Sequence, residues 1–257
     1  MTNEHVPDSL KVFFAEHPKL ALAFSGGTDS SYLLYAALAC GVDVRPYYAS
    51  TQFQPTFELE DARRLCQELD ADLTVLPYNV LSHEEVAANP SDRCYHCKHA
   101  LFGQLLKAAA ADGYAELMDG TNASDDAGDR PGMKALREKG VFSPLRLCGI
   151  PKDEIRALSK AADLFTWDKP AYACLATRVP AGVRIDAQTL AKVERAEGAL
   201  FDLGFSDFRV RVMGGAAKLQ MPEEQFPLAA TLAGAIREAL GQDFTDILLD
   251  LKPRGQG

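Results

Sequence analysis

The chain has 257 residues and a formal net charge of −9 at pH 7, a length that holds one large domain or one medium-sized and one small domain. Its acidic balance argues against a protein whose main partner is nucleic acid, because binding to phosphates needs a basic surface. No apolar run of about 18 residues occurs, and residues 1–5 lack the pattern of a signal peptide, so we expect a cytoplasmic protein without a membrane partner. The six cysteines are then expected to be thiols or metal ligands rather than disulfides.

A nucleotide phosphate site is predicted near the N-terminus. The apolar run of residues 20–24 is typical of a buried strand, and a helical pattern begins after the motif that follows it. That motif consists of Ser25, Gly26, Gly27, Thr28, Asp29 and Ser30. Glycines permit close backbone approaches, while hydroxyl groups and free N–H groups at the start of the helix attract an anion. No Gly-Lys-Ser or Gly-Lys-Thr follows, so the motif is not a Walker A loop.

This motif resembles the PP-loop of the ATP pyrophosphatases, which cleave ATP between the α and β phosphates and leave AMP on the substrate. The resemblance implies that the loop binds the departing pyrophosphate and that Asp29 helps to hold Mg²⁺. A glycine-rich turn that binds no ligand is the alternative interpretation.

The pattern up to about residue 180 predicts an α/β domain. Strand-like runs at residues 42–49, 72–76 and 116–119 alternate with helical patterns at 56–69, 97–111 and 151–161, which indicates a parallel, Rossmann-like sheet with helices on both faces. Ligands of such sheets bind beyond the carboxyl ends of the strands. We therefore expect adenine and ribose near Ser50, and the reacting phosphates or the substrate near Gly120, Thr121 and Asn122.

A smaller α/β domain is expected after residue 180, which gives domains at 1–180 and 181–257. A helical pattern at 187–203 precedes two strand patterns, 208–213 and 216–221, and a helix at 223–240 and a strand at 246–251 follow. The first domain is expected to bind ATP. The second is expected to bind substrate and to form oligomers.

The two strand patterns around Gly214 and Gly215 predict a hairpin with a two-residue turn. This register places Arg211 opposite Lys218, with Arg209 two positions along. Like charges opposite each other destabilise a sheet unless an anion or an acid lies between them. We therefore expect an anion site, with a solvated basic face as the alternative.

The cysteines fall into two groups. Cys94 and Cys97 form a Cys-x-x-Cys at the start of a helical pattern, and Cys174 lies in a distant polar loop. Three thiolates can hold three irons of a [4Fe-4S] cluster and leave the fourth iron open for a labile ligand such as sulfide. Zinc, a redox pair and free thiols remain alternatives. The other three cysteines lie in apolar patterns and are expected to be small buried side chains: Cys40, Cys66 and Cys148.

Four motifs together resemble the LarE family of ATP-dependent sulfur transferases over nearly the whole chain. They are Ser25 to Ser30, Arg93-Cys94-Tyr95-His96-Cys97-Lys98, Asp119-Gly120-Thr121-Asn122, and residues 167–178, which begin Trp-Asp-Lys-Pro and contain Cys174. The PP-loop motif is shared by many enzymes, whereas the Trp-Asp-Lys-Pro block is specific to this family.

The resemblance implies a substrate, pyridinium-3,5-biscarboxylic acid mononucleotide, whose carboxylates become thiocarboxylates on the way to the nickel-pincer cofactor of lactate racemase. It implies catalytic roles for Cys174, Asp29, Asp168 and Arg178, and a substrate-phosphate site at Arg209 and Arg211. In one branch of the family the cysteine matching Cys174 gives up its own sulfur. In the other branch two more cysteines join it around a [4Fe-4S] cluster, and Cys94 and Cys97 favour this branch. Relatives resemble homo-oligomers, and a sulfide donor is expected as a further partner.

Three other functions remain possible at this point. A tRNA thiolase uses the same loop and often three cysteines, but it needs a basic surface or an added RNA-binding domain. An amide-forming enzyme of the NAD synthetase type would use ammonia and need no cysteine trio. An ATP-sensing module would release no pyrophosphate with any acceptor.

Overall fold

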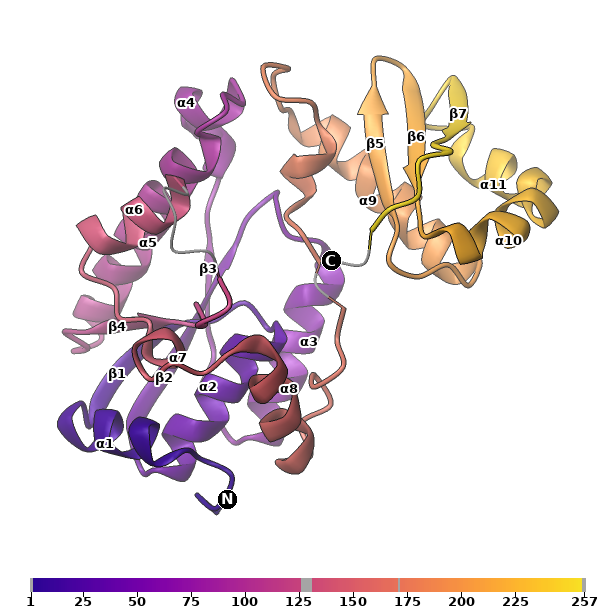
Figure 1. Cartoon of the computed structure of the whole chain (residues 1–257). Coiled ribbons are helices and arrows are strands. Elements are labelled where there is room, and N and C mark those ends of the chain that lie inside the picture. The colour runs from indigo at the N-terminus through magenta and orange to yellow at the C-terminus, as the bar shows by residue number, and fades with distance from the viewer. Residues whose placement is uncertain (1, 126–130, 171, 256–257) are drawn as a thin grey trace. The chain divides into compact units, whose positions relative to one another are not determined.

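The structure is a computed structural model that describes residues 2–125, 131–170 and 172–255. Contacts between residues divide the chain into two compact units, shown in Figure 1. The first comprises Met1–Val80 and Asp92–Lys169, and the second comprises Leu81–Ser91 and Pro170–Gly257. The division therefore differs from the expected boundary at residue 180, because residues 170–180 and a short excursion at residues 81–91 pack with the C-terminal part.

The first unit contains a four-stranded parallel sheet in the order β3-β2-β1-β4. Its strands are β1 (Lys19–Ala23), β2 (Asp43–Ser50), β3 (Thr74–Pro77) and β4 (Leu117–Asp119). Its helices are α1 (Asp8–Glu16), α2 (Thr28–Ala39), α3 (Thr56–Glu68), α5 (Arg93–Ala111), α6 (Pro131–Glu138), α7 (Pro144–Leu147) and α8 (Lys152–Ala161). The expected strands and the helices at 56–69, 97–111 and 151–161 are thus confirmed, although α5 begins earlier, at Arg93. The sequence did not predict α1, α6 or α7.

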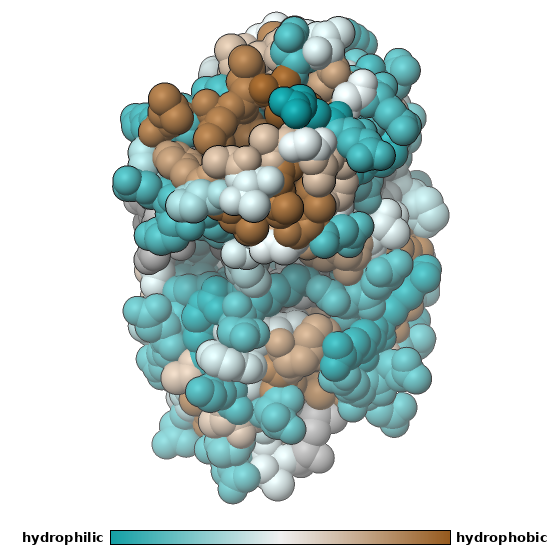
Figure 2. Space-filling view, turned by 90° about the vertical axis from the view of Figure 1, so that its right-hand side faces the viewer, coloured by the Kyte–Doolittle hydropathy of each residue, from teal (hydrophilic) through white to brown (hydrophobic). Residues whose placement is uncertain are grey.

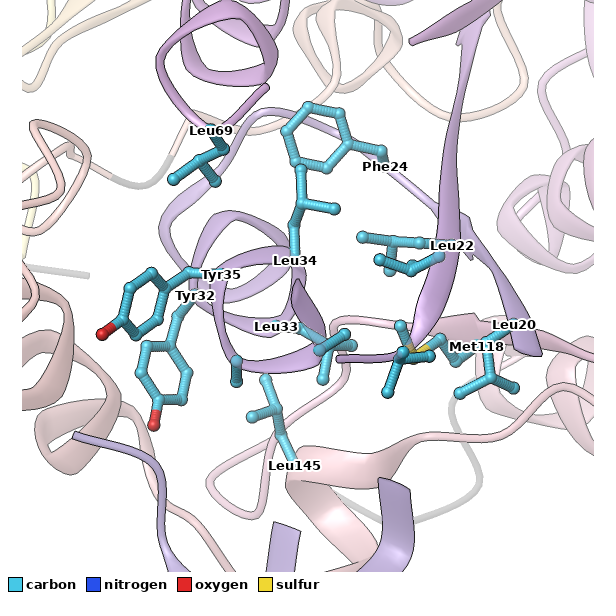
Figure 3. Close-up of a cluster of buried hydrophobic side chains, with 14 of the residues drawn as sticks. Leu20, Leu22, Phe24, Tyr32, Leu33, Leu34, Tyr35, Leu69, Met118 and Leu145 are labelled. Atoms are coloured by element: carbon cyan, nitrogen blue, oxygen red, sulfur yellow. The ribbon is translucent and has the colours of Figure 1, made fainter. Parts of the chain in front are cut away.

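The period-two alternation of strand side chains gives this sheet two buried faces. Leu20 and Leu22 belong to the apolar cluster that also contains residues of α1, α2, α3, α7 and α8, and Figure 3 shows Leu22 turned toward Leu34 of α2 and Leu20 beside Met118. Ala21, between them in β1, belongs to the opposite cluster with residues of α5 and α6. Helices cover both faces, as expected for an α/β sheet.

The order of the strands reverses between β1 and β4, because β2 and β3 extend to one side of β1 and β4 lies on the other. In open parallel sheets the crevice at such a reversal, beyond the carboxyl ends of the strands, is where ligands bind. The loop at residues 25–30 follows β1 and the loop at residues 120–125 follows β4. Two of the predicted ligand-binding segments are therefore neighbours at this point.

The second unit contains a three-stranded sheet in the order β5-β6-β7. Its elements are α4 (Glu84–Ala87), a 3₁₀ turn η2 (Leu175–Arg178), α9 (Ala187–Asp202), β5 (Arg209–Met213), β6 (Ala216–Gln220), η3 (Glu223–Gln225), α10 (Phe226–Thr231), α11 (Ala233–Leu240) and β7 (Asp246–Leu249). The hairpin register is confirmed, with Val210 opposite Leu219 and Arg211 opposite Lys218.

The helix expected at residues 223–240 is wrong as a continuous element. Pro227 lies in the first turn of α10, where its missing N–H is tolerated, so a new helix begins there. Leu232 then leaves helical geometry, with φ −93° and ψ 12°, and separates α10 from α11. Residues of α10, α11, β6 and β7 together line a mostly apolar groove of about 240 Å³ on both sides of this break. Figure 2 looks onto this side of the unit and shows apolar residues gathered there.

Candidate functional site

The loop between β1 and α2 has a backbone that requires glycine. Gly26 has φ +70°, and a Cβ atom at this position would lie 3.1 Å from the carbonyl oxygen of Glu58 and 3.2 Å from the Cβ of Ala62 on α3. Both the left-handed conformation and the close contact exclude a side chain. The loop therefore passes directly over α3 before α2 begins at Thr28.

Hydroxyl groups of the loop hold its own backbone. The Ser25 and Ser30 Oγ atoms lie 3.0 Å apart, the Gly27 N–H donates to Ser25 Oγ at 3.3 Å, and Ser30 Oγ donates to the Gly27 carbonyl at 3.1 Å. These bonds curl the chain around the first turn of α2, where backbone N–H groups lack helical partners. The arrangement is that of an anion-binding loop at the N-terminus of a twelve-residue helix.

The Thr28 hydroxyl was expected to face a bound anion, but the structure places it elsewhere. Its side chain is buried, and its Oγ1 donates to the carbonyl oxygen of Thr166 at 2.8 Å. Because that proton is already donated within the protein, the hydroxyl anchors the loop to the segment before Trp167 instead. Only the Thr28 backbone remains a candidate for ligand contact.

Asp29 lies in the first turn of α2 and has two partners. Lys152 Nζ, at the start of α8, lies 2.7 Å from Asp29 Oδ1, and Asn122 Nδ2 donates to Asp29 Oδ2 at 3.3 Å. The sequence identified Asp29 and Asn122 as site residues but missed Lys152. No local pattern marks this lysine, because its contact joins residues 123 positions apart in the chain.

The segment after β4 packs against the loop. A Cβ on Gly120 would lie 2.9 Å from the backbone nitrogen of Ser30, so only glycine allows this approach. The Thr121 hydroxyl donates to the Asp119 carboxylate at 2.5 Å, and the Ser143 hydroxyl donates to it at 2.6 Å. Burial raises the pKa of the Asp119 carboxyl group above its usual value, even though these hydrogen bonds lower it.

The first unit thus brings most of the predicted nucleotide residues to one edge of the sheet. Ser50 is the last residue of β2, the strand that pairs with β1. In the loop after β4, the Asn122 side-chain oxygen accepts hydrogen bonds from the backbone N–H groups of Ser124 and Asp125 and so forms a turn. Strand ends, helix N-terminus and the Asp29 carboxylate therefore meet at the reversal in strand order. Such a set of groups can bind a polyphosphate together with a divalent cation.

The Trp-Asp-Lys part of the family block is tied to this loop through Lys169. The Lys169 Nζ lies 2.6 Å from Asp61 Oδ2 on α3 and donates to the Gly26 carbonyl at 3.3 Å. Arg156 of α8 donates to the carbonyl oxygens of Trp167 and Lys169. Lys169 was not among the predicted site residues, whereas Asp168, which was, is exposed to solvent.

Cys94 and Cys97 lie in the first turns of α5, in the first unit. Cys94 is exposed, and the guanidinium of the buried Arg93 lies 3.5 Å from its Sγ. Within residues 2–125, 131–170 and 172–255, no three His, Cys, Asp or Glu side chains form a group suited to a metal ion. The pair belongs to the first unit and Cys174 to the second.

A buried ion pair organises the segment around Cys174. The Arg178 side chain has no exposed surface, and it donates to both carboxylate oxygens of Glu197, at 2.7 and 2.9 Å. Arg178 also donates to the carbonyl oxygen of Ala173 at 2.9 Å, and the Glu197 carboxylate accepts from the Tyr172 hydroxyl. These bonds hold the chain on both sides of Cys174, which is itself partly exposed. Arg178 is therefore placed to position this segment.

Beside this segment lies a cavity of about 300 Å³ lined by Arg178, Pro180, Arg211, Val212, Met213, Lys218 and Gln220. Arg211 donates to the carbonyl oxygen of Thr177 at 2.9 Å, and Lys218 pairs with Asp250 at 3.0 Å. Asp250 is thus the acid that the opposed charges of the hairpin required. Basic and apolar side chains together line this cavity.

Arg209 is buried two positions before Arg211 in β5, with its guanidinium 5.5 Å from the centre of the Tyr172 ring. The pKa of Arg209 is lowered to about 10, first by burial and then by the positive charges of Arg178 and Arg254, against the opposing effect of Glu197 and Asp207. A cation that is disfavoured by both burial and like charges gains from a bound anion. The substrate-phosphate site expected at Arg209 and Arg211 stays a prediction.

Of the three cysteines predicted to be small buried side chains, Cys66 is buried, whereas Cys40 and Cys148 are only partly buried. Cys66 belongs to the apolar cluster of the first unit, and Cys40 and Cys148 pack against it. Burial raises the pKa of all three thiols, that of Cys66 to about 12, which disfavours the reactive thiolate.

In the described part of the chain, none of the helices combines the length and the apolar character that crossing a bilayer requires.

Comparisons with known proteins find related sequences, although no family model matches the chain. It is 36% identical over 251 residues to an uncharacterised protein of Synechocystis, covering 95% of this chain and 93% of that protein. It is 33% identical over 207 residues to pyridinium-3,5-bisthiocarboxylic acid mononucleotide synthase of Lactiplantibacillus plantarum, covering 80% of this chain and 75% of that enzyme. The tRNA-specific 2-thiouridylase MnmA of Dichelobacter nodosus is 27% identical over 188 residues, which cover 58% of this chain and 49% of that enzyme.

Proposed function

Since the chain belongs to the LarE family of ATP-dependent sulfur transferases of the PP-loop type, we propose that it adenylates the carboxylates of pyridinium-3,5-biscarboxylic acid mononucleotide. It then converts them to thiocarboxylates in the biosynthesis of the nickel-pincer nucleotide cofactor. The observation that carries this proposal is the joint presence of the Ser25–Ser30 loop beside Asp29 and, in the second unit, a basic cavity next to the Cys174 segment.

Activation of the carboxylate takes place at the loop. A carboxylate oxygen of the substrate attacks the α phosphorus of ATP, the bond to the β-phosphate oxygen breaks, and an acyl adenylate and pyrophosphate form. The backbone N–H groups at the start of α2 stabilise the charge that grows on the departing pyrophosphate. The Asp29 carboxylate is an oxygen ligand of the kind that Mg²⁺ prefers, and the metal would neutralise phosphate charge there.

Substrate orientation is assigned to the second unit. The substrate carries its own phosphate, and Arg211 and Lys218 line the cavity while Arg209 lies buried in the same strand as Arg211. Arginine binds phosphate through two parallel hydrogen bonds, so it both attracts the group and fixes its direction. The ring carboxylates then extend from a phosphate whose position is set.

Sulfur is transferred by attack of a sulfur nucleophile on the carbonyl carbon of the acyl adenylate, with AMP as the leaving group. We propose that Cys94, Cys97 and Cys174 ligate a [4Fe-4S] cluster whose fourth iron carries a replaceable sulfide. Three thiols suit this cluster, and the Arg93 guanidinium lies 3.5 Å from the Cys94 sulfur, where a positive charge can stabilise a negatively charged thiolate-ligated cluster. In the alternative branch of the family, Cys174 gives up its own sulfur.

A cytoplasmic, homo-oligomeric enzyme that also requires a sulfide donor completes the proposal. Exposed apolar side chains of the second unit, among them Leu248, Leu249 and Leu251, support association between copies of the chain. The net charge of −9 favours a small-molecule acceptor over tRNA.

Incubation of the protein with ATP, Mg²⁺ and the biscarboxylate mononucleotide tests the function. We expect AMP, pyrophosphate and a thiolated product, measured by chromatography and mass spectrometry. Release of ADP, or pyrophosphate release only with tRNA or ammonia as the acceptor, would contradict the proposal. The mass of the polypeptide identifies the sulfur source, because loss of one H₂S shows that Cys174 was consumed.

Anaerobic reconstitution with iron and sulfide tests the cluster. We expect about four irons per chain and a visible absorption band that Cys94→Ala removes, while the control Cys148→Ala, at a partly buried thiol outside the proposed ligand set, retains it. A colourless wild-type protein would exclude the cluster and leave the sacrificial reaction of Cys174.

A further inference from the structure

Lys152 is held in place at both ends. Its backbone N–H donates to Ser124 Oγ at 2.9 Å, and its Nζ lies 2.7 Å from Asp29 Oδ1. The Lys152 side chain is 30% exposed and the Asp29 side chain is 24% exposed, so the pair is half shielded from water but open to a ligand. The lysine therefore connects the start of α8, the loop after β4 and the first turn of α2.

The position of this lysine in its own helix is unfavourable. Lys152 is the first residue of α8, and a positive charge there opposes the helix dipole. The next two residues, Asp153 and Glu154, carry the negative charge that this end of a helix favours. Nothing in α8 itself therefore accounts for a lysine at this position, and Asp29, with which its side chain pairs, belongs to the nucleotide loop.

Asp29 is also the carboxylate proposed to hold Mg²⁺, so the ammonium and the metal compete for one partner. Two cations at a single carboxylate repel each other unless further negative charge lies between them. The polyphosphate of ATP, or the pyrophosphate that leaves, supplies that charge. With it present, Asp29 can turn to the metal while the ammonium donates to phosphate oxygens.

We propose that Lys152 is a phosphate-contacting residue that exchanges Asp29 for the polyphosphate when nucleotide and Mg²⁺ bind. The ammonium keeps Asp29 neutralised before binding and stabilises the departing pyrophosphate during activation. This role rests on the proposed function, in that the loop must bind a polyphosphate. Lys169 has a different role, because its Nζ contacts the Gly26 carbonyl and the Asp61 carboxylate and so supports the backbone of the loop.

Pyrophosphate binding in the presence of Mg²⁺, measured by calorimetry, tests the contact. Lys152→Met should weaken binding about ten- to hundredfold, as expected for loss of a hydrogen bond to a charged group. Lys152→Arg should retain most of the affinity. The matched control Lys107→Met removes the same charge from an exposed position on α5 and should leave binding unchanged.

The response to metal alone separates this role from a structural one. Mn²⁺ added without phosphate and followed by electron paramagnetic resonance should bind Lys152→Met more tightly than wild type, because the competing ammonium is gone. A lysine that merely holds the fold would, when removed, weaken the binding of both Mn²⁺ and pyrophosphate. That result, or pyrophosphate binding by Lys152→Met equal to wild type, would overturn the proposal.

Amine acetylation of the wild-type protein provides a test that does not depend on how the variants fold. Mg²⁺ and pyrophosphate should protect Lys152 from acetylation and leave Lys107 reactive, as read by mass spectrometry, and unprotected Lys152 would contradict the contact. None of these measurements needs an acyl substrate or a sulfur donor. If wild type fails to bind pyrophosphate, the proposed function fails at its first step. If wild type binds it and Lys152→Met binds equally, only the assignment of Lys152 fails.

Discussion

The carboxyl group of Asp119 combines burial with several hydrogen bonds at the carboxyl end of β4. Its 6% exposure removes most of the water that would stabilise the charge, and burial is the largest cause of its raised pKa. The hydroxyl groups of Thr121 and Ser143 replace part of the lost hydration by donating hydrogen bonds to the carboxylate. In return, the carboxylate fixes the backbone of Thr121, next to the Gly120 contact with the nucleotide loop.

The raised pKa of Asp119 predicts a specific pH dependence of stability. The unfolded chain ionises this group at its ordinary pKa, whereas the folded protein keeps the proton up to a higher pH. The cost of burying the charge is therefore present at neutral pH and disappears as the pH falls through the raised folded pKa toward about 4. The unfolding free energy of wild type should accordingly rise relative to that of Asp119→Asn over this range, as measured by urea denaturation.

Asp250 provides the opposite control for this experiment. Hydrogen bonds from Gln220 and Lys218 lower its pKa to about 2. Its contribution to stability is present above the ordinary pKa of aspartate and is lost as the pH falls toward about 2, so wild type should lose stability relative to Asp250→Asn there. A difference between wild type and Asp119→Asn that stays constant with pH would show that the Asp119 pKa is not raised.

At the scale of elements, the contact between the end of β4 and the start of α2 sets the shape of the nucleotide loop. Gly120 permits the approach to Ser30, Gly26 permits the turn over α3, and the Thr28 hydroxyl holds the far side through Thr166. Each contact joins backbone to backbone or to a short side chain, which leaves little freedom for adjustment. Loop geometry therefore depends on the packing of three elements rather than on the loop sequence alone.

Two glycine-to-alanine substitutions should show the difference between a glycine required by tight packing and a glycine that only lowers helix propensity. Gly120→Ala places a Cβ 2.9 Å from the Ser30 nitrogen, so the loop must shift and the affinity for pyrophosphate with Mg²⁺ should fall at least about tenfold. Gly198→Ala, in the middle of α9 where a Cβ meets no atom within 4 Å, should instead stabilise the protein by about 1 kcal/mol. Calorimetry and thermal unfolding measure the two effects, and unchanged pyrophosphate binding by Gly120→Ala would refute the argument.

At the scale of the whole molecule, the chain leaves its first unit at residues 81–91 and returns to it afterwards. Asn89 secures this excursion within the second unit, because its buried amide donates to the carbonyl oxygens of Val179, Pro180 and Val183. Its φ of +54° is one that asparagine adopts more readily than most residues. The second unit is therefore assembled from two separate stretches of the chain.

Removing this amide should weaken the second unit selectively. Asn89→Ala leaves three carbonyl groups without their donor, that of the buried Val179 among them, and places alanine in the left-handed region, so we expect a loss of about 2–4 kcal/mol. Hydrogen exchange should increase in α9 and in β5 and β6, while β1 and β2 keep their protection. Glu84→Ala, which removes an exposed ion pair to Arg184 in the same excursion, should change little. Equal loss of protection in both units would contradict this division of the chain.

The sequence by itself determined the features that are encoded locally. A buried strand pattern, a glycine-rich motif and a helical pattern are consecutive in the chain, so the nucleotide loop and its place at the end of β1 could be predicted. The hairpin register followed in the same way from the alternation around Gly214 and Gly215. The predicted continuous helix at 223–240 was wrong, because a new helix begins at Pro227 and the chain leaves helical geometry again at Leu232.

The tertiary structure alone decided which charged groups meet. The pairs Lys152 with Asp29 and Lys169 with Asp61 join residues far apart in the chain, and no pattern in either segment specifies its partner. The same holds for Thr28, whose hydroxyl is donated to Thr166 and not to a ligand. Electrostatic partners are set by distance in space, which depends on how every intervening element packs, and this information is absent from any short window of sequence.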